Sequence, residues 1–229
     1  MAKIDYDDED AVLEEVARAL DEDPDDLRIE EDRGLTGFGE GTVYSVTTRG
    51  GRKEWQVVEN DDQERALALA VVQQDLEEEP EIFNRDFIER HIDKDKLRSE
   101  LHSDALDMRI EELSEMSPDD FWREWENEGF EFPEYTMTDD ERDEMMDPDD
   151  GDVETLAEKQ IDAQLRDPMQ YLEEIYGDEA AAKALEIAGF AIAAAAEDAV
   201  DTDGPAHFLA RYDGQSHTTR SGLVYWRSN

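Results

Sequence analysis

The feature that most constrains the fold of this chain is the uneven distribution of its charge. The sequence has 66 Asp and Glu against 22 Lys and Arg, for a net charge of −44. Residues 1–32 carry −12 of this and residues 59–204 carry −36, whereas residues 33–58 and 205–229 each carry +2. The two segments with a small positive charge are also the two in which apolar and polar residues alternate as they do in β-strands.

The first of these segments has the pattern of a β-hairpin. Alternating β-branched and aromatic residues occupy 42–48 and 53–58, on either side of Gly50 and Gly51, which favour a tight turn. A strand at 27–30 precedes the hairpin, and residues 222–226 form one more short strand. We therefore expect a small antiparallel sheet made of the hairpin 42–58 and the C-terminal strand.

The rest of the chain is typical of helices. Apolar residues recur at helical spacing, and the expected helices are 10–20, 61–78, 82–92, 94–116, 117 onward, 138 onward, 153–165, 168–176 and 179–200. The last is rich in alanine and is expected to be one central, buried helix, and the Asp-Pro-Gly stretch 147–152 is expected to be a linker. The fold class is α+β, mostly helical. Charge divides the chain into an N-terminal helix plus hairpin (1–60), an acidic helical region (61–204) and a C-terminal clasp (205–229), forming one compact domain.

The charge limits the partners. A chain this acidic lacks the basic footprint that phosphate binding requires, so we expect no direct contact with nucleic acid or with an anionic membrane. The N-terminus has no apolar signal segment, and the longest apolar run, 187–196, is shorter than the ~20 residues of a membrane span. With no cysteine, disulfides and thiolate metal sites are excluded. We expect a cytoplasmic protein, in the host cytoplasm if a virus encodes it.

Two interpretations of the acidity remain open. A haloadapted surface uses carboxylates to hold water and cations, and its repulsion is screened in salt. A nucleic-acid mimic instead places carboxylates at phosphate-like positions to occupy the basic cleft of a DNA-binding enzyme. The basic residues are mostly arginine, which is a habit of high-salt proteomes and of GC-rich genomes. Disorder is disfavoured because the chain is 38% hydrophobic and its apolar residues are periodic.

Motifs for catalysis or for a cofactor do not emerge. Neither Gly151 nor Gly204 sits in an EF-hand loop with acids at the required positions, and the glycines between 34 and 41 match no phosphate-binding loop. His207, Asp213 and His217 could form a two-histidine, one-carboxylate site, but nothing in their spacing demands it, and ordinary hydrogen-bonded histidines in a capped turn are favoured. We predict a protein that is not an enzyme, with no catalytic residue, cofactor or dedicated metal site, and with diffuse cation binding by surface carboxylates.

An aromatic cluster is the first candidate for a partner contact. Its members are Phe121, Trp122, Trp125, Phe130, Phe132 and Tyr135. Aromatic residues surrounded by acids are typical of docking patches. The helical spacing of Phe121, Trp122 and Trp125 is more often that of a buried core.

The last 30 residues or so resemble a family of small acidic proteins encoded by phages and plasmids. The resemblance rests on the Asp-Gly-Pro-Ala-His-Phe-Leu-Ala-Arg-Tyr-Asp-Gly stretch at 203–214 and on the Tyr-Trp-Arg-Ser-Asn end at 225–229. That family has no established activity, so the resemblance implies a mobile-element origin. Its box is expected to be a structural clasp, in which Phe208, Leu209 and Tyr212 pack on the last helix. The remaining clasp residues are His207, Asp213 and Gly214 at the turn, and Tyr225 in the strand.

These observations favour a non-enzymatic accessory protein of a mobile element or its host, adapted to high salt and acting by protein–protein contact. The alternative is a DNA mimic that inhibits a nuclease, a restriction enzyme or another DNA-binding enzyme. The expected partner is a protein, and in the second case a basic, DNA-binding one.

Overall fold

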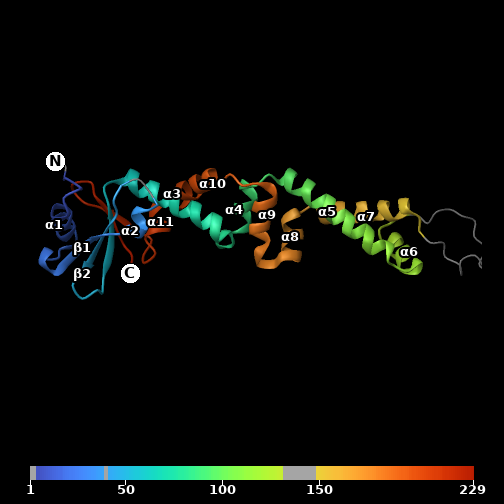
Figure 1. The fold of residues 1–229 in the computed structure, drawn as a ribbon, viewed down its shortest axis with the longest axis horizontal. Coiled ribbons are helices and arrows are strands. Elements are labelled where there is room, and N and C mark those ends of the chain that lie inside the picture. Colours follow the sequence, from blue (N-terminus) through green and yellow to red (C-terminus); the bar gives the residue numbers. More distant parts are fainter. Residues whose placement is uncertain (1–3, 39–40, 131–147) are drawn as a thin grey trace, which may run out of the picture. The chain divides into compact units, whose positions relative to one another are not determined.

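The computed structural model describes residues 4–38, 41–130 and 148–229. The chain divides into two compact units (Figure 1). The sheet unit comprises Met1–Ile82 and Ala191–Asn229, and the helical unit comprises Phe83–Phe190. The α+β, mostly helical fold class is confirmed. The predicted division at residues 60 and 204 differs from these units, because charge follows the surface whereas a compact unit is defined by the apolar faces that pack together.

The described strands of the sheet unit form one antiparallel sheet in the order β1-β2-β3-β5-β4. Their bounds are β1 Leu27–Glu31, β2 Tyr44–Thr48, β3 Glu54–Val58, β4 Ser216–Thr218 and β5 Val224–Arg227. The predicted hairpin, the strand before it and the C-terminal strand are confirmed, and β5 pairs with β3 as expected. β4 was not predicted, because three polar residues carry no alternation.

Each face of this sheet is covered by helix. On one face α1 (Glu9–Leu20) contributes Val12 and Val16 to a core with Val46, Val57 and Tyr225. Residues next along the strands, such as Val58 and Trp226, point to the other face and are also buried. That face receives α3 (Asp61–Glu78), against which α10 (Ile192–Asp203) and α11 (Pro205–Leu209) pack. The unit also contains α2 (Arg33–Thr36), η1 (Pro24–Asp26) and η2 (Pro80–Ile82).

The helical unit contains α4 (Arg85–His91), α5 (Lys94–Ser114), α6 (Pro118–Asn127), α7 (Asp150–Gln164), α8 (Pro168–Tyr176), η3 (Gly177–Glu179) and α9 (Ala180–Ala188). α5 and α7 pack antiparallel, since Arg98 near the start of α5 pairs with Asp162 near the end of α7, and Leu113 shares a core with Val153. α8 and α9 pack against α5 as well. α4 is tied to α8 by Arg85, which is 2.6 Å from a carboxylate oxygen of Asp167.

Two expectations for the helices were wrong. The alanine-rich segment 179–200 is not one helix: α9 ends at Ala188, Gly189 adopts φ +76°, and α10 begins at Ile192. This positive φ is open to glycine and strained for other residues, so Gly189 ends α9 even within an alanine run. Within the expected linker, residues 150–152 instead start α7, because Asp149 forms a capping box with Asp152.

Within the described ranges, no helix is long and apolar enough to cross a membrane.

Candidate functional site

The exposed side of α5 carries a column of five carboxylates. Its members, the α5 column, are Glu100, Asp104, Asp107, Glu111 and Glu115. They follow one another at intervals of three or four residues, which places them on one helix face with about 5–6 Å between successive Cβ atoms. None of the five forms an ion pair with another residue that the structure describes.

A second column follows on α7. Asp150, Glu154, Glu158 and Asp162, the α7 column, recur every four residues and are all exposed. Asp162 is 3.1 Å from the Arg98 guanidinium, and its carboxylate is 3.8 Å from the His102 ring. The other three lack an ion pair within the described part of the chain.

These columns hold like charges close together. Like-charged neighbours three or four residues apart destabilise a helix by about 0.2–0.5 kcal/mol a pair, so the six neighbouring pairs that do not include Asp162 oppose folding by about 1–3 kcal/mol at low salt. Other acids of the unit are neutralised: the Arg109 guanidinium lies 2.7 Å from Glu112 and also contacts Glu124. The columns therefore present charge that cations or a basic partner can neutralise.

The linear density of this charge can be set against that of DNA. A rise of 1.5 Å per residue places a carboxylate about every 6 Å along each column. Duplex DNA carries one negative charge per ~1.7 Å of its axis. Each column thus reaches roughly a quarter to a third of the charge density of duplex DNA.

Most residues of the predicted aromatic contact lie in the core of the helical unit. Phe121, Trp122 and Trp125 are buried, at 0%, 5% and 7% exposure, against Leu113 and α7. Phe130 is partly buried and stacks on Trp125 with ring centroids 4.3 Å apart. Because these rings fill the space between α5, α6 and α7, they do not form an exposed docking patch. Phe132 and Tyr135 lie outside the described residues.

The predicted clasp is placed in the sheet unit, with one change. Leu209 is buried in α11, Phe208 is partly buried, and Tyr225 lies in β5 opposite Val57. The chain turns at Asp213, which accepts a hydrogen bond from the Gln215 N–H, and at Gly214, whose φ is +67°.

Tyr212 was expected to pack on the last helix, but it does not. It is 56% exposed, and its ring carries the Arg227 guanidinium at 3.8 Å. This cation–π contact joins the turn to β5 instead.

The end of the sheet near the hairpin turn carries several basic side chains next to the acids of residues 21–26, since the Arg49 N–H donates to the Asp26 carbonyl oxygen. Arg49 and Arg52 in the turn, and Arg28 opposite Thr47 on the edge strand β1, are exposed and form no ion pair with other described residues. Lys53 is 3.4 Å from Glu22 and lies over the Trp55 ring. The absence of acidity that the sequence indicated for this segment therefore becomes a local surface of unpaired arginine.

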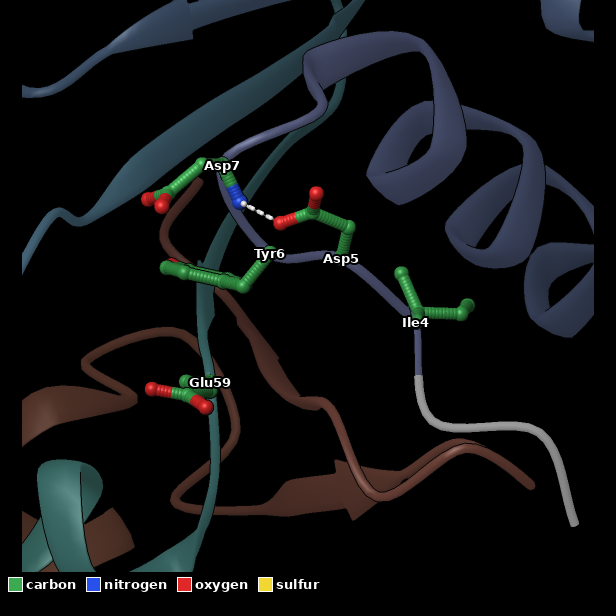
Figure 2. A pocket seen from close by; sticks show the side chains of 5 residues that line it. All are labelled: Ile4, Asp5, Tyr6, Asp7 and Glu59. Atoms are coloured by element: carbon green, nitrogen blue, oxygen red, sulfur yellow. Dashed lines mark hydrogen bonds between the residues drawn. The ribbon is translucent and has the colours of Figure 1, made fainter.

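One hollow of the sheet unit surrounds Tyr6 (Figure 2). It measures about 350 Å³ and is lined by Ile4, Asp5, Tyr6, Asp7 and Glu59. The Tyr6 hydroxyl lies 2.8 Å from the Thr42 carbonyl oxygen and 2.9 Å from that of Val57. Burial, with nearby Tyr44 and Glu59, raises the pKa of Tyr6 far above its usual range. Tyr6 thus stays neutral and anchors the N-terminal segment to the sheet.

A second hollow, of about 520 Å³, lies between α1 and the β4–β5 turn. Its lining includes Arg18, Arg220, Glu14 and Glu15. Glu15 is buried and accepts hydrogen bonds from the Ser221 N–H and hydroxyl at 3.3 and 3.1 Å, and it also pairs with Arg18. These bonds make Glu15 a structural tie between α1 and the turn.

A buried carboxylate lies at the start of α3. Glu64 is 6% exposed, and its Oε1 has no hydrogen-bond partner. Burial raises the pKa of Glu64, with a smaller increase from Asp61, whereas a hydrogen bond with Ser216 of β4 lowers it. Gln56 of β3 also has an unpartnered buried oxygen. Neither residue stood out in the sequence.

Among the described residues, no group of three or more His, Asp or Glu is arranged to hold a metal ion. His207 and His217, considered with Asp213 as a ligand set, instead contact aromatic rings. Their ring centroids lie 4.9 Å from Phe208 and 5.3 Å from Tyr225, respectively.

Comparison with family models, curated proteins and solved structures gave no match to this chain. The resemblance of the C-terminal box to the phage and plasmid proteins therefore remains a prediction.

Sequence reasoning missed the columns, although their signal was present. The acids at 100, 104, 107, 111 and 115 follow the same spacing rule that identifies apolar faces. What the sequence lacks is the position of the basic side chains, which decides which carboxylates are paired.

Proposed function

We propose that this chain is a non-enzymatic accessory protein that acts by contact with a basic protein surface, through the carboxylate columns of α5 and α7. The observation that carries the proposal is the regular alignment of exposed carboxylates, all but Asp162 unpaired within the described residues, on two adjacent helices. A basic partner would relieve their mutual repulsion, so part of the association energy comes from strain already present in the free protein.

The more specific form of this proposal is mimicry of DNA. Its support is the linear charge density of each column, roughly a quarter to a third of that of duplex DNA, held on an α-helix. A nuclease, a restriction enzyme or another DNA-binding enzyme offers the kind of basic cleft that such a surface complements. A mobile element would use such a protein against host enzymes.

Adaptation to high salt is compatible with this role. In molar salt the Debye length is about 3 Å, shorter than the spacing within a column, so the repulsion is largely screened. Uniform salt adaptation alone does not account for the unpaired Arg28, Arg49 and Arg52 at the hairpin end.

The test removes four charges from one column and compares the result with four charges removed elsewhere. The column variant is Glu100→Gln, Asp104→Asn, Asp107→Asn and Glu111→Gln. The matched control, of equal net charge, is Glu77→Gln, Glu79→Gln, Glu81→Gln and Glu197→Gln, at exposed positions of the sheet unit. Each tagged protein is incubated with an extract of the source cells.

We expect the parent and the control to retain basic proteins that duplex DNA displaces, and the column variant to lose them. Equal retention by the column and control variants would contradict a role for the columns. Retained proteins that duplex DNA leaves in place would contradict mimicry while leaving protein–protein contact intact.

A further inference from the structure

The hollow between α1 and the β4–β5 turn belongs to the sheet unit and has no part in the carboxylate columns. Its volume of about 520 Å³ lies within the range of about 300–1,000 Å³ that is typical of small-molecule sites. We call it the α1 hollow, and its lining residues are Ile4, Ala11, Glu14, Glu15, Arg18, Arg220 and Ser221. The chemistry of this lining decides which kind of molecule fits.

One side of the α1 hollow is held in place by buried hydrogen bonds. The carboxylate of Glu15, which is 5% exposed, accepts hydrogen bonds from the hydroxyl and the N–H of Ser221, and it also pairs with the Arg18 guanidinium. Thr219 is buried as well, and its hydroxyl lies 2.9 Å from that of Ser221. These bonds fix the turn that carries Arg220 against α1, so the lining is already arranged before any molecule binds.

Two opposite charges of the lining are not compensated. Arg220 on the turn and Glu14 on α1 are exposed, and neither forms an ion pair with another residue that the structure describes. They line the same hollow without pairing with each other, so their charged groups lie farther apart than those of an ion pair. Since Arg18 and Glu15 neutralise each other, the α1 hollow offers one guanidinium and one carboxylate to a bound molecule.

This arrangement favours a zwitterion over a molecule with a single charge. A guanidinium binds a carboxylate through two parallel hydrogen bonds, and a carboxylate binds an ammonium group. A plain anion would be repelled by residues 1–32, which carry a net charge of −12, and a plain cation would leave Arg220 without a partner. Ile4 and Ala11 add an apolar part to the lining, which suits a zwitterion with an apolar side chain.

We propose that the α1 hollow binds a free α-amino acid with an apolar side chain. Its carboxylate is held by Arg220, its ammonium group faces Glu14, and its side chain lies against Ile4 and Ala11. This site goes beyond the proposed function, because it lies in the other unit and takes a small molecule in place of a basic protein. A few polar groups that fix the orientation of a ligand beside an apolar wall are the usual plan of such sites.

The test compares leucine with three analogues that each lack one feature. N-acetylleucine lacks the positive charge, leucinamide lacks the negative charge, and glycine lacks the apolar side chain. Binding to the full-length chain is measured by saturation-transfer NMR at about pH 6.5, where the α-amino group is protonated. We expect leucine to bind at least about tenfold more tightly than each analogue, because each lost charged hydrogen bond or apolar contact accounts for about that factor.

Point variants locate the contact. Arg220→Gln should weaken leucine binding about tenfold and remove the preference for leucine over leucinamide, and Glu14→Gln should remove the preference for leucine over N-acetylleucine. Both residues are exposed and unpaired within the described residues, so the fold is retained, as circular dichroism will verify. Arg49→Gln and Asp10→Asn remove the same charges from exposed positions outside the hollow and should leave every preference unchanged.

Three results would overturn the amino-acid site. One is the absence of leucine binding up to about 20 mM, and another is equal binding of leucine and either analogue with a single charge. The third is a preference for leucine over leucinamide that persists in Arg220→Gln. The column variant, whose substitutions lie in the helical unit, should bind leucine as the parent does, so these results and those of the extract experiment are independent.

Discussion

The sheet unit and the helical unit accommodate acidic residues in different ways. The described strands contain Glu30, Glu31 and Glu54, two of them on the edge strand β1, whereas α5 and α7 carry acids on every exposed turn. In a sheet each residue faces a neighbour directly across the ladder, where like charges destabilise the pair by up to about 1 kcal/mol. On a helix face like charges also destabilise, but by only about 0.2–0.5 kcal/mol a pair. Part of the charge asymmetry along the chain therefore follows from the fold itself.

The hairpin turn is a different case. Arg49 and Arg52 lie outside the strands, so the cross-strand argument does not apply to them. Their lack of ion pairs in so acidic a chain distinguishes this end of the sheet unit from the columns of the helical unit.

The largest expected effect concerns the two cores. Phe121→Ala in the helical unit and Trp226→Ala in the sheet unit each remove a ring that is at most 1% exposed, which should lower the free energy of unfolding by about 3–5 kcal/mol. Hydrogen exchange read by mass spectrometry should reveal the loss of protection mainly within the unit that carries the substitution. If each substitution deprotected both units equally, the two cores would have to be treated as one cooperative structure.

The next effect concerns salt. Raising KCl from dilute buffer to 1 M should stabilise the helical unit by about 1–3 kcal/mol, because it screens the repulsion within the columns. Protection of residues 94–114 should increase more than protection of the hairpin 44–58, and circular dichroism should follow the gain of helix. Sucrose, which screens nothing, serves as the control. An equal gain in both units would argue against the columns as its source.

The smallest effect concerns the buried carboxylate of Glu64. The pKa of Glu64 is raised in the folded state. Its contribution to the stability of the folded state is therefore fully present below the unfolded pKa of about 4.3, and it is lost as the pH rises through the folded pKa. Glu64→Gln should therefore stabilise the sheet unit by about 1 kcal/mol or less at pH 7 and have no effect near pH 4. Denaturant unfolding at both pH values measures this.

The exposed Glu77→Gln on the same helix is the control for that comparison and should be neutral at both pH values. Destabilisation by Glu64→Gln at pH 7 would mean that the bond between Glu64 and Ser216 outweighs the effect of burial.

Local patterns predicted the elements well where the pattern was strong. The bounds of α3 and α8 agree with those expected from sequence, and the pairing of β5 with β3 followed from the alternation of both segments. The sequence did not predict the end of α9, because a glycine within a helix is less favourable than alanine by only about 1 kcal/mol in helix propensity. That difference is too small to predict a break in so strong an alanine run.

The candidate site depended on information that local patterns lack. Leu101 and Met108 lie on the same side of α5, and the packing of neighbouring helices decides that one is buried and the other exposed. Likewise, Phe121 and Trp125 suit a core and a docking patch equally until the neighbouring α7 is placed. Elements follow from short-range periodicity, whereas a surface follows from how the elements are packed.

The order of strands also bears on how the chain is made. β5 lies between β3 and β4, yet the whole helical unit separates it from β3 in the sequence. During synthesis the hairpin therefore leaves the ribosome with one side of β3 unpaired. That side stays unpaired while the helical segment, whose contacts are more local, emerges and folds. The translation time of the helical unit thus sets the interval during which an open strand edge must avoid pairing with other chains.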